Sequence, residues 1–254
     1  MDPVAAEGFR RAVDAYERGR PAYPLEAVAW LVEALRIGPG TTVVDVGAGT
    51  GKLTSQLVPT GATIVAVEPI YAMRAALAAK LPTVTAHPGM AEALPLQTAS
   101  ADAILAAQAF HWFNIPAAAV EFSRVLRPGG RLGVIWNERD TSVDWVSELD
   151  SIVEPYRRDG PHPRSQREVE LGDRFGPLHY ADFSHAQVVD LDTLRDRVAS
   201  MSFVAVLPDE ERMRILDRVA ALAATHPAMA GRAAFRLPYR TSAWWAERRD
   251  RLRG

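Results

Sequence analysis

The chain of 254 residues contains no cysteine. This absence excludes disulfides, metal sites built on thiolates and catalysis by a cysteine nucleophile. No stretch approaches the roughly 20 consecutive apolar residues that a membrane-spanning helix requires. Residues 1–11 also lack the charged start and the apolar run of a secretory signal. We therefore expect a cytoplasmic protein with no membrane partner.

An excess of one charge is missing as well, because the formal net charge is only −2. Nucleic-acid-binding domains usually carry a surplus of Lys and Arg, so we expect no nucleic-acid partner. The six histidines show neither a His-x-x-x-His pair nor a carboxylate-flanked triad, so we expect no metal site. A Gly-x-Ser-x-Gly turn is absent, so the sequence does not predict a Ser-His-Asp hydrolase. Lys52 precedes Leu53 rather than a Ser or Thr, so the glycine-rich turn does not match a triphosphate-binding loop.

The most informative segment that is present is a glycine-rich turn at residues 47–51, directly after an apolar run at residues 43–46. Buried parallel strands are typically continuous apolar runs, and glycines let the following backbone turn tightly and approach a ligand. The next such run, residues 64–67, ends at Glu68, a position suited to ribose hydroxyls. Ligands bind beyond the carboxyl ends of such strands, so this pair of features indicates a nucleoside-bearing cofactor.

Two cofactors compete for this geometry. The spacing Gly47-x-Gly49-x-Gly51 departs from the Gly-x-Gly-x-x-Gly pattern that is typical of nicotinamide enzymes. Asp45 would be a poor neighbour for a diphosphate but suits a ligand that carries an amine or a sulfonium. S-adenosylmethionine carries both groups and is therefore favoured over NAD. The structural alternative is a tight connection in which Asp45 bonds only the amides of the turn.

Five segments, in this order and spacing, resemble the class I S-adenosylmethionine-dependent methyltransferases, and in particular the small-molecule branch called methyltransferase type 11. They are residues 43–51, 67–69 with Met73, 89–96, 108–113 and 124–130. Residues 16–24 resemble a segment that covers the cofactor in one subgroup of that family. The resemblance is strong over residues 9–140 and loose beyond them, so it does not identify the methyl acceptor.

The resemblance implies S-adenosylmethionine as the cofactor, S-adenosylhomocysteine as its product, and a set of twelve binding residues. Arg20 would grip the methionyl carboxylate with its guanidinium, and Ala91 and Glu92 would meet adenine. The predicted set is Tyr16, Arg20, Asp45, Gly47, Ala48, Gly49, Glu68, Pro69, Met73, Ala91, Glu92 and Gln108.

Each of these roles has a structural alternative. Glu68 could favour a helix start through the helix dipole, and Glu92 could simply face solvent. Gln108 could pair with backbone only, and Arg20 could form a surface ion pair. His111 is the candidate catalytic base because it follows the fourth predicted strand and histidine titrates near neutral pH. It could instead pack the wall of the site.

The chain is expected to form an α/β fold, a doubly wound, Rossmann-like, mostly parallel sheet of seven strands with an antiparallel edge hairpin and a small helical cap. Strands are predicted at residues 43–46, 64–67, 83–86, 103–107, 132–136, 186–189 and 232–240. Helices are predicted at residues 25–35, 52–57, 71–80, 117–126, 145–156, 194–199 and 210–224.

We predict one domain over residues 1–254. It comprises a cofactor-covering segment (1–36), a cofactor-binding core (38–138), a substrate cap (139–180) and the last strands and helices (181–254). The predicted function is methyl transfer to a small organic acceptor by in-line displacement at the sulfonium methyl. A non-catalytic S-adenosylmethionine-binding sensor or partner subunit and an NAD-dependent oxidoreductase are the alternatives. The sequence does not indicate an oligomeric state.

Overall fold

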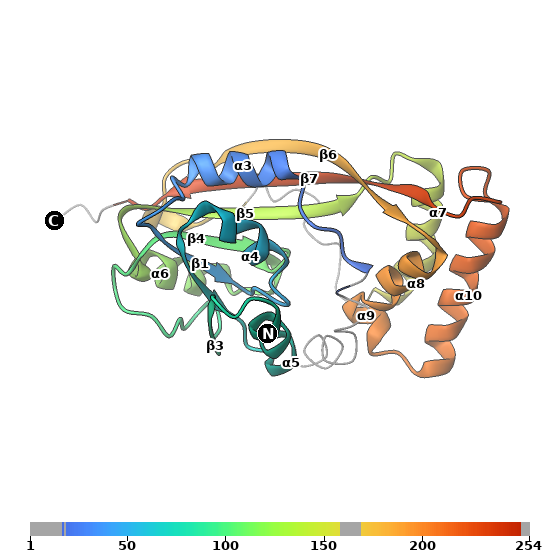
Figure 1. Ribbon diagram of the computed structural model, residues 1–254, viewed down its shortest axis with the longest axis horizontal. Helices are drawn as coiled ribbons and strands as arrows, with labels where there is room; N and C mark the ends of the chain where they lie inside the picture. Colours follow the sequence, from blue (N-terminus) through green and yellow to red (C-terminus); the bar gives the residue numbers. More distant parts are fainter. Residues whose placement is uncertain (1–16, 18, 158–168, 250–254) are drawn as a thin grey trace. The chain divides into compact units, whose positions relative to one another are not determined.

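The structure, a computed structural model, describes residues 17, 19–157 and 169–249 of the chain (Figure 1). The chain divides into two compact units. Of the described residues, the core unit comprises 22–137, 169–183 and 241–249, and the helical unit comprises 17, 19–21, 138–157 and 184–240. Tyr16 lies outside the described residues. The subdivision predicted from the sequence stays a prediction.

A seven-stranded sheet runs through the chain in the order β3-β2-β1-β4-β5-β7-β6. Strand β1 pairs in parallel with β2 and β4, β2 pairs in parallel with β3, and β4 pairs in parallel with β5. The antiparallel strands lie at the other edge, where β7 and β6 follow β5. The predicted fold class is therefore confirmed. The strands are β1 (Thr42–Val46), β2 (Thr63–Val67), β3 (Thr85–His87), β4 (Ala101–Ala107), β5 (Leu126–Arg139), β6 (His179–Val189) and β7 (Phe235–Glu247).

Helices lie close to their predicted positions in both units. The core unit contains α3 (Leu25–Ala34), α4 (Lys52–Leu57), α5 (Tyr71–Lys80) and α6 (Ile115–Val125). The helical unit contains α7 (Asp144–Val153), α8 (Leu191–Ala199), α9 (Ser202–Ala205) and α10 (Asp209–Thr225), with α10 packed on α7 and α8. Among the described residues, no helix combines the length and the apolar character needed to cross a membrane.

The parallel strands are buried on both faces, as their continuous apolar runs predict. On one face, Val43 and Leu105 join a buried cluster with Leu31 of α3, Leu53 of α4 and Leu77 of α5. Residues next to them in sequence point to the other face, because successive side chains of a strand alternate. The core unit is therefore a sheet covered by α3, α4 and α5 on one side and by α6 on the other.

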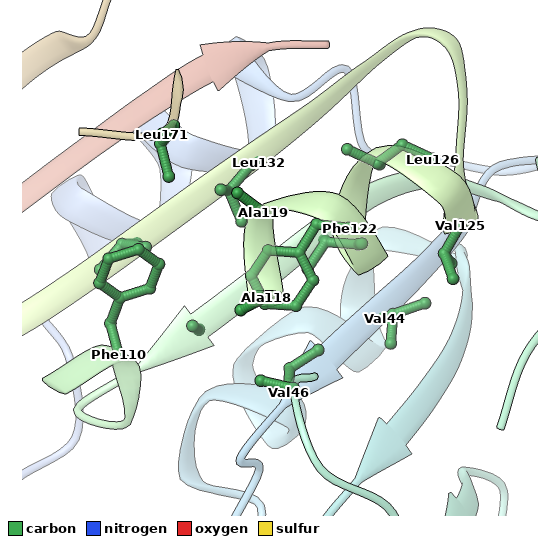
Figure 2. Close-up of a cluster of buried hydrophobic side chains, with 14 of the residues drawn as sticks. Val44, Val46, Phe110, Ala118, Ala119, Phe122, Val125, Leu126, Leu132 and Leu171 are labelled. Atoms are coloured by element: carbon green, nitrogen blue, oxygen red, sulfur yellow. The ribbon is translucent and has the colours of Figure 1, made fainter. Parts of the chain in front are cut away.

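Helix α6 provides most of the second face. Figure 2 shows Phe122 and Ala118 of α6 directed toward Val44 and Val46 of β1, with Leu132 of β5 nearby. Phe122 is completely buried. Asn114 caps the helix by accepting a hydrogen bond from the amide of Ala117, so the helix starts where the amphipathic pattern begins.

The fifth strand differs from its prediction. The sequence predicts a helix that ends at residue 126 and a strand that begins at residue 132, but β5 already begins at Leu126 and includes Pro128-Gly129-Gly130. The pairing with β4 shifts register there, since Ala101 faces Leu126 whereas Ala103 faces Arg131. The extra residues form an irregularity in which Gly129 adopts a φ of 72°, a conformation that favours glycine. Strands β6 and β7 are also longer than the sequence pattern predicts.

The packing of α6 yields a test of the fold. Phe122→Ala should lower the free energy of unfolding by about 3–5 kcal/mol, because it removes a buried aromatic ring and leaves a cavity. Val120→Ala is the matched control on the same helix, since Val120 is 48% exposed, and should change stability by less than about 1 kcal/mol. Urea denaturation of both variants measures the difference, and equal losses would contradict the observed orientation of α6.

Candidate functional site

The glycine-rich turn lies over the carboxyl end of β2. The amides of Gly47 and Ala48 donate to the carbonyl of Val67, at 2.8 and 3.3 Å. The amide of Gly49 donates to Oε2 of Glu68 at 2.9 Å. The structure therefore brings the predicted turn residues together with Glu68 at one edge of the sheet.

Gly47 is required at its position for two reasons. Its φ is 69°, in the left-handed region that side chains other than glycine rarely adopt. A Cβ at Gly47 would also lie 2.5 Å from the Cβ of Ala109, which is too close. This approach places the segment that follows β4, with Gln108 and His111, directly beside the turn.

Asp45 at the end of β1 is completely buried. Its Oδ2 accepts a hydrogen bond from Thr54 Oγ1 at 2.6 Å, whereas Oδ1 is buried and has no hydrogen-bond partner within the described residues. Burial raises the pKa of Asp45 to about 6, the bond from Thr54 opposes that rise, and the charge of Glu68 adds to it. The hydrogen bond goes to α4 rather than to the turn, contrary to the structural alternative for this residue.

Glu68 holds backbone amides with both of its oxygens. Oε2 binds Gly49, and Oε1 accepts from the amide of Ile70 at 2.9 Å, directly before α5. Burial raises the pKa of Glu68, and the bonds from Ile70 and Gly49 oppose the rise. Arg74 donates to the carbonyls of Glu68 and Pro69, at 2.6 and 3.3 Å. Glu68 thus joins the glycine turn to the start of α5, and its contact with ribose stays a prediction.

Gln108 ends β4 in a left-handed conformation, with a φ of 54°. A residue other than glycine there costs on the order of 1–3 kcal/mol, and such positions gather at functional sites. Its side-chain Nε2 donates to the carbonyl of Asn137 at 2.6 Å, so the backbone pairing considered as an alternative is present. Oε1 of Glu92 accepts from the amide of Asn114 at 2.7 Å, which connects its loop to the start of α6.

The other predicted residues of the core unit lie in apolar surroundings. Met73 and Ala91 are almost completely buried, at 3% and 2% exposure. His111 is half-buried and packs against Trp112 and Trp136, with ring centroids 4.3 and 4.6 Å away. This packing agrees with the alternative in which His111 forms part of the wall of the site. Its role as a catalytic base stays a prediction.

Arg20 belongs to the helical unit. Its Nε donates to Ser200 Oγ at 3.3 Å and its Nη2 to the Ser200 carbonyl at 3.2 Å. These two bonds hold its guanidinium against Ser200. The predicted contact with the methionyl carboxylate stays a prediction.

Sequence reasoning missed three residues that organise this edge. Thr54 holds Asp45, Arg74 holds the carbonyls after β2, and neither position carries a local signal in the sequence. Asn137 is buried, donates to the carbonyl of Ala22 at 3.2 Å and accepts from Thr241 Oγ1 at 2.6 Å. Its place at the end of the fifth apolar run is the signal that could have identified it.

One group in the helical unit has the composition of a metal site. Single ligand atoms of Asp144, Glu148 and His226 lie within 4.8 Å of one another. However, Nδ1 of His226 accepts from the amide of Ala228 at 3.2 Å, so a neutral imidazole carries its proton on Nε2, which faces the carboxylates. A metal at Nε2 would require the other tautomer, so the arrangement does not favour a metal ion.

The residues at the edge of the core unit fit S-adenosylmethionine. Within the described residues, Oδ1 of Asp45 has no hydrogen-bond partner, so it requires a donor or a cation. Buried carboxylates beside a glycine turn suit an amine and a sulfonium better than a diphosphate.

Comparisons with known proteins agree with this geometry. The sequence model of the family described as "Methyltransferase domain" matches residues 44–134. An "Uncharacterized methyltransferase" of Mycobacterium tuberculosis (strain ATCC 25618 / H37Rv) is 46% identical over 233 residues, which cover 92% of each chain. An "Uncharacterized methyltransferase-like" protein of Schizosaccharomyces pombe is 35% identical over 250 residues, which cover 97% of this chain and 98% of its own.

Solved structures share the fold at lower identity. A "Putative Type II Methyltransferase" from Anaeromyxobacter dehalogenans is 23% identical, with a TM-score of 0.64 and coverage of 91% of this chain and 97% of its own. The YcgJ protein of Bacillus subtilis is 17% identical, with a TM-score of 0.54 and coverage of 89% and 99%. At these identities the two structures show the fold alone.

The long, closely related chains establish the family, and with it the predicted enzyme class and the cofactor that defines the family. The chain belongs to the class I S-adenosylmethionine-dependent methyltransferases, in the type 11 branch.

Proposed function

We propose that this protein transfers the methyl group of S-adenosylmethionine to a small organic acceptor, at the carboxyl edge of the parallel strands in the core unit. One observation carries the proposal of the site: Asp45 is buried at that edge with an oxygen that lacks a hydrogen-bond partner within the described residues. A buried acceptor atom of this kind needs a donor or a cation, and the cofactor offers both.

The proposed roles follow from the position of each group. Asp45 would hold the positively charged methionyl part of the cofactor, and Glu68 would accept from ribose hydroxyls while its bonds to the turn keep it in place. Ala91 and Glu92 would meet adenine. The remaining predicted contacts, proposed on the resemblance, are Tyr16, Arg20, Gly47, Ala48, Gly49, Pro69, Met73 and Gln108.

When bound, S-adenosylmethionine supplies a methyl group on an electron-deficient sulfur, which an O, N, S or C nucleophile can displace in line. The protein then has to orient the acceptor and exclude water. Phe110, Trp112 and Phe113 surround His111 on the segment beside the turn, and their rings provide an apolar wall. His111 would take up the proton of an acceptor that must lose one.

Cofactor binding tests the proposed site. Isothermal titration should show S-adenosylmethionine and S-adenosylhomocysteine binding to the wild type. Asp45→Asn should weaken S-adenosylmethionine binding about 10- to 100-fold, since a hydrogen bond to a charged group contributes about 1.5–3 kcal/mol. Glu68→Gln should also weaken it, because the variant disturbs the turn and removes the predicted ribose contact.

Asp102→Asn is the matched control for this titration. Asp102 accepts from the amide of Thr42 at 2.7 Å and lies at the amino end of β4, so its loss should leave cofactor affinity unchanged. Equal losses in Asp45→Asn and Asp102→Asn would contradict the proposed site. Binding of NAD alone would support the oxidoreductase alternative, and cofactor binding without turnover of any acceptor would support the non-catalytic module.

The raised pKa of Asp45 predicts a pH-dependent stability. The folded-state pKa of about 6 lies above the usual value of 3.8, so the contribution of the protonated carboxyl is complete below 3.8 and is lost as pH rises through 6. Asp45→Asn removes this loss. As pH rises from about 4 to about 6, the variant should gain stability relative to the wild type, by up to about 3 kcal/mol, and the gain should stay constant at higher pH. Urea denaturation at pH values below 4, between 4 and 6, and above 7 measures the gain, and the same difference at all of them would contradict the assigned ionisation.

The role of His111 is tested by a separation of binding from turnover. His111→Gln should lower kcat by about 10²–10⁴-fold for an acceptor that loses a proton, with S-adenosylmethionine affinity unchanged. The acidic limb of the pH profile should disappear, and added imidazole should restore part of the rate. A loss of less than tenfold, with the pH profile retained, would assign His111 to the wall alone.

A further inference from the structure

Two arginines are buried in the helical unit. The side chain of Arg139, at the end of β5, is only 8% exposed. Its Nη2 pairs with Asp150 of α7, and its Nη1 faces the sulfur of Met201 at 3.9 Å, a weak acceptor. Its Nε is buried and has no hydrogen-bond partner within the described residues.

Arg197, in the last turn of α8, shares these features. The residue is 6% exposed, and its Nε donates to the hydroxyl of Tyr239 at 3.3 Å. Its Nη1 is buried without a hydrogen-bond partner in the part of the chain that the structure describes. The Tyr239 hydroxyl in turn donates to Gln187 Oε1 at 3.4 Å, so the groups that meet Arg197 there are neutral.

Apolar surroundings make it energetically unfavourable to bury the positive charges of Arg139 and Arg197 there. The buried cluster of the helical unit includes Leu194, Val198 and Met201, next to Arg197 in sequence. Burial and then the charge of Arg197 lower the pKa of Arg139, whereas Asp150 raises it. Buried charges are normally paired, and a guanidinium offers five donors. A trapped water could accept from the open N–H groups, but it would not offset the second positive charge.

The charges of the surrounding groups indicate which ligand would offset the second positive charge. Two guanidinium groups and the carboxylate of Asp150 leave one positive charge, which matches a monovalent carboxylate better than a phosphate dianion. The planar fork of a guanidinium also fits a carboxylate in a bidentate way.

We propose that Arg139 and Arg197 bind the carboxylate of an organic acid within the helical unit. Asp150 keeps Arg139 in place, and Tyr239 keeps Arg197 in place.

Pairs of ligands that differ only in charge test the anion site. Phenylacetate with phenylacetamide, and hexanoate with hexanamide, are titrated into the full-length protein with S-adenosylhomocysteine present, by calorimetry and by thermal shift. The carboxylates should bind and raise the Tm, and the amides should bind at least tenfold more weakly. Amides that bind as tightly as the acids would overturn the proposal, as would tighter binding of phenyl phosphate than of phenylacetate.

Variants assign the binding to the arginines. Arg197→Gln should weaken phenylacetate binding at least tenfold and leave S-adenosylmethionine affinity unchanged. Arg214→Gln is the control, since Arg214 is exposed on α10 and pairs with Glu210. If Arg197→Gln does not fold, Arg197→Lys keeps the charge but loses the fork, and should still weaken binding of phenylacetate. Unchanged carboxylate affinity in the folded variants would overturn the assignment.

The outcomes separate this inference from the proposed function. S-adenosylmethionine binding without any preference for acids would overturn the anion site alone. Acid binding without S-adenosylmethionine binding would overturn the proposed function alone.

Discussion

The candidate site depends on one costly arrangement, a carboxylate buried at the end of an apolar strand. Asp45 follows two buried residues of β1, and its pKa is raised to about 6 because burial disfavours its charged form. The bond from Thr54 offsets only part of that cost. A core selected for stability alone would place an apolar side chain here, so the retained carboxylate indicates that function outweighs stability at this position.

Glu68 places a second buried acid at the same edge, and its bonds to Gly49 and Ile70 link the glycine turn to α5. The turn is therefore held in shape by the residue predicted to meet the ribose. The segment that follows β4 is joined to this edge as well. The close approach of Gly47 to Ala109 brings in the segment after β4, and Gln108 ties that segment to Asn137. Such a network preorganises backbone donors and carboxylates before a ligand arrives, which lowers the cost of binding it.

The sequence predicts the parallel half of the fold well because its strands are continuous apolar runs punctuated by glycine and proline. It predicts the edge strands poorly, since β6 is mostly half-exposed and its apolar pattern is weak. In β5 the Pro128-Gly129-Gly130 segment lies within an irregular strand, because pairing with β4 outweighs the local turn preference. Thr54 and Arg74 were missed for a related reason: their contacts depend on how α4 and α5 pack, which no local pattern encodes.

The two units bury charge of opposite sign. In the core unit the buried ionisable groups Asp45 and Glu68 are acids, and in the helical unit Arg139 and Arg197 are bases. In a transfer from a sulfonium the positive charge is spread over several atoms in the transition state, so water, which stabilises the localised charge of the reactant, slows it. In the core unit, buried acids that hold the cation would replace water with fixed charges. Glycine spacing revealed only the first of these sites, because the burial of an arginine is a property of the folded chain.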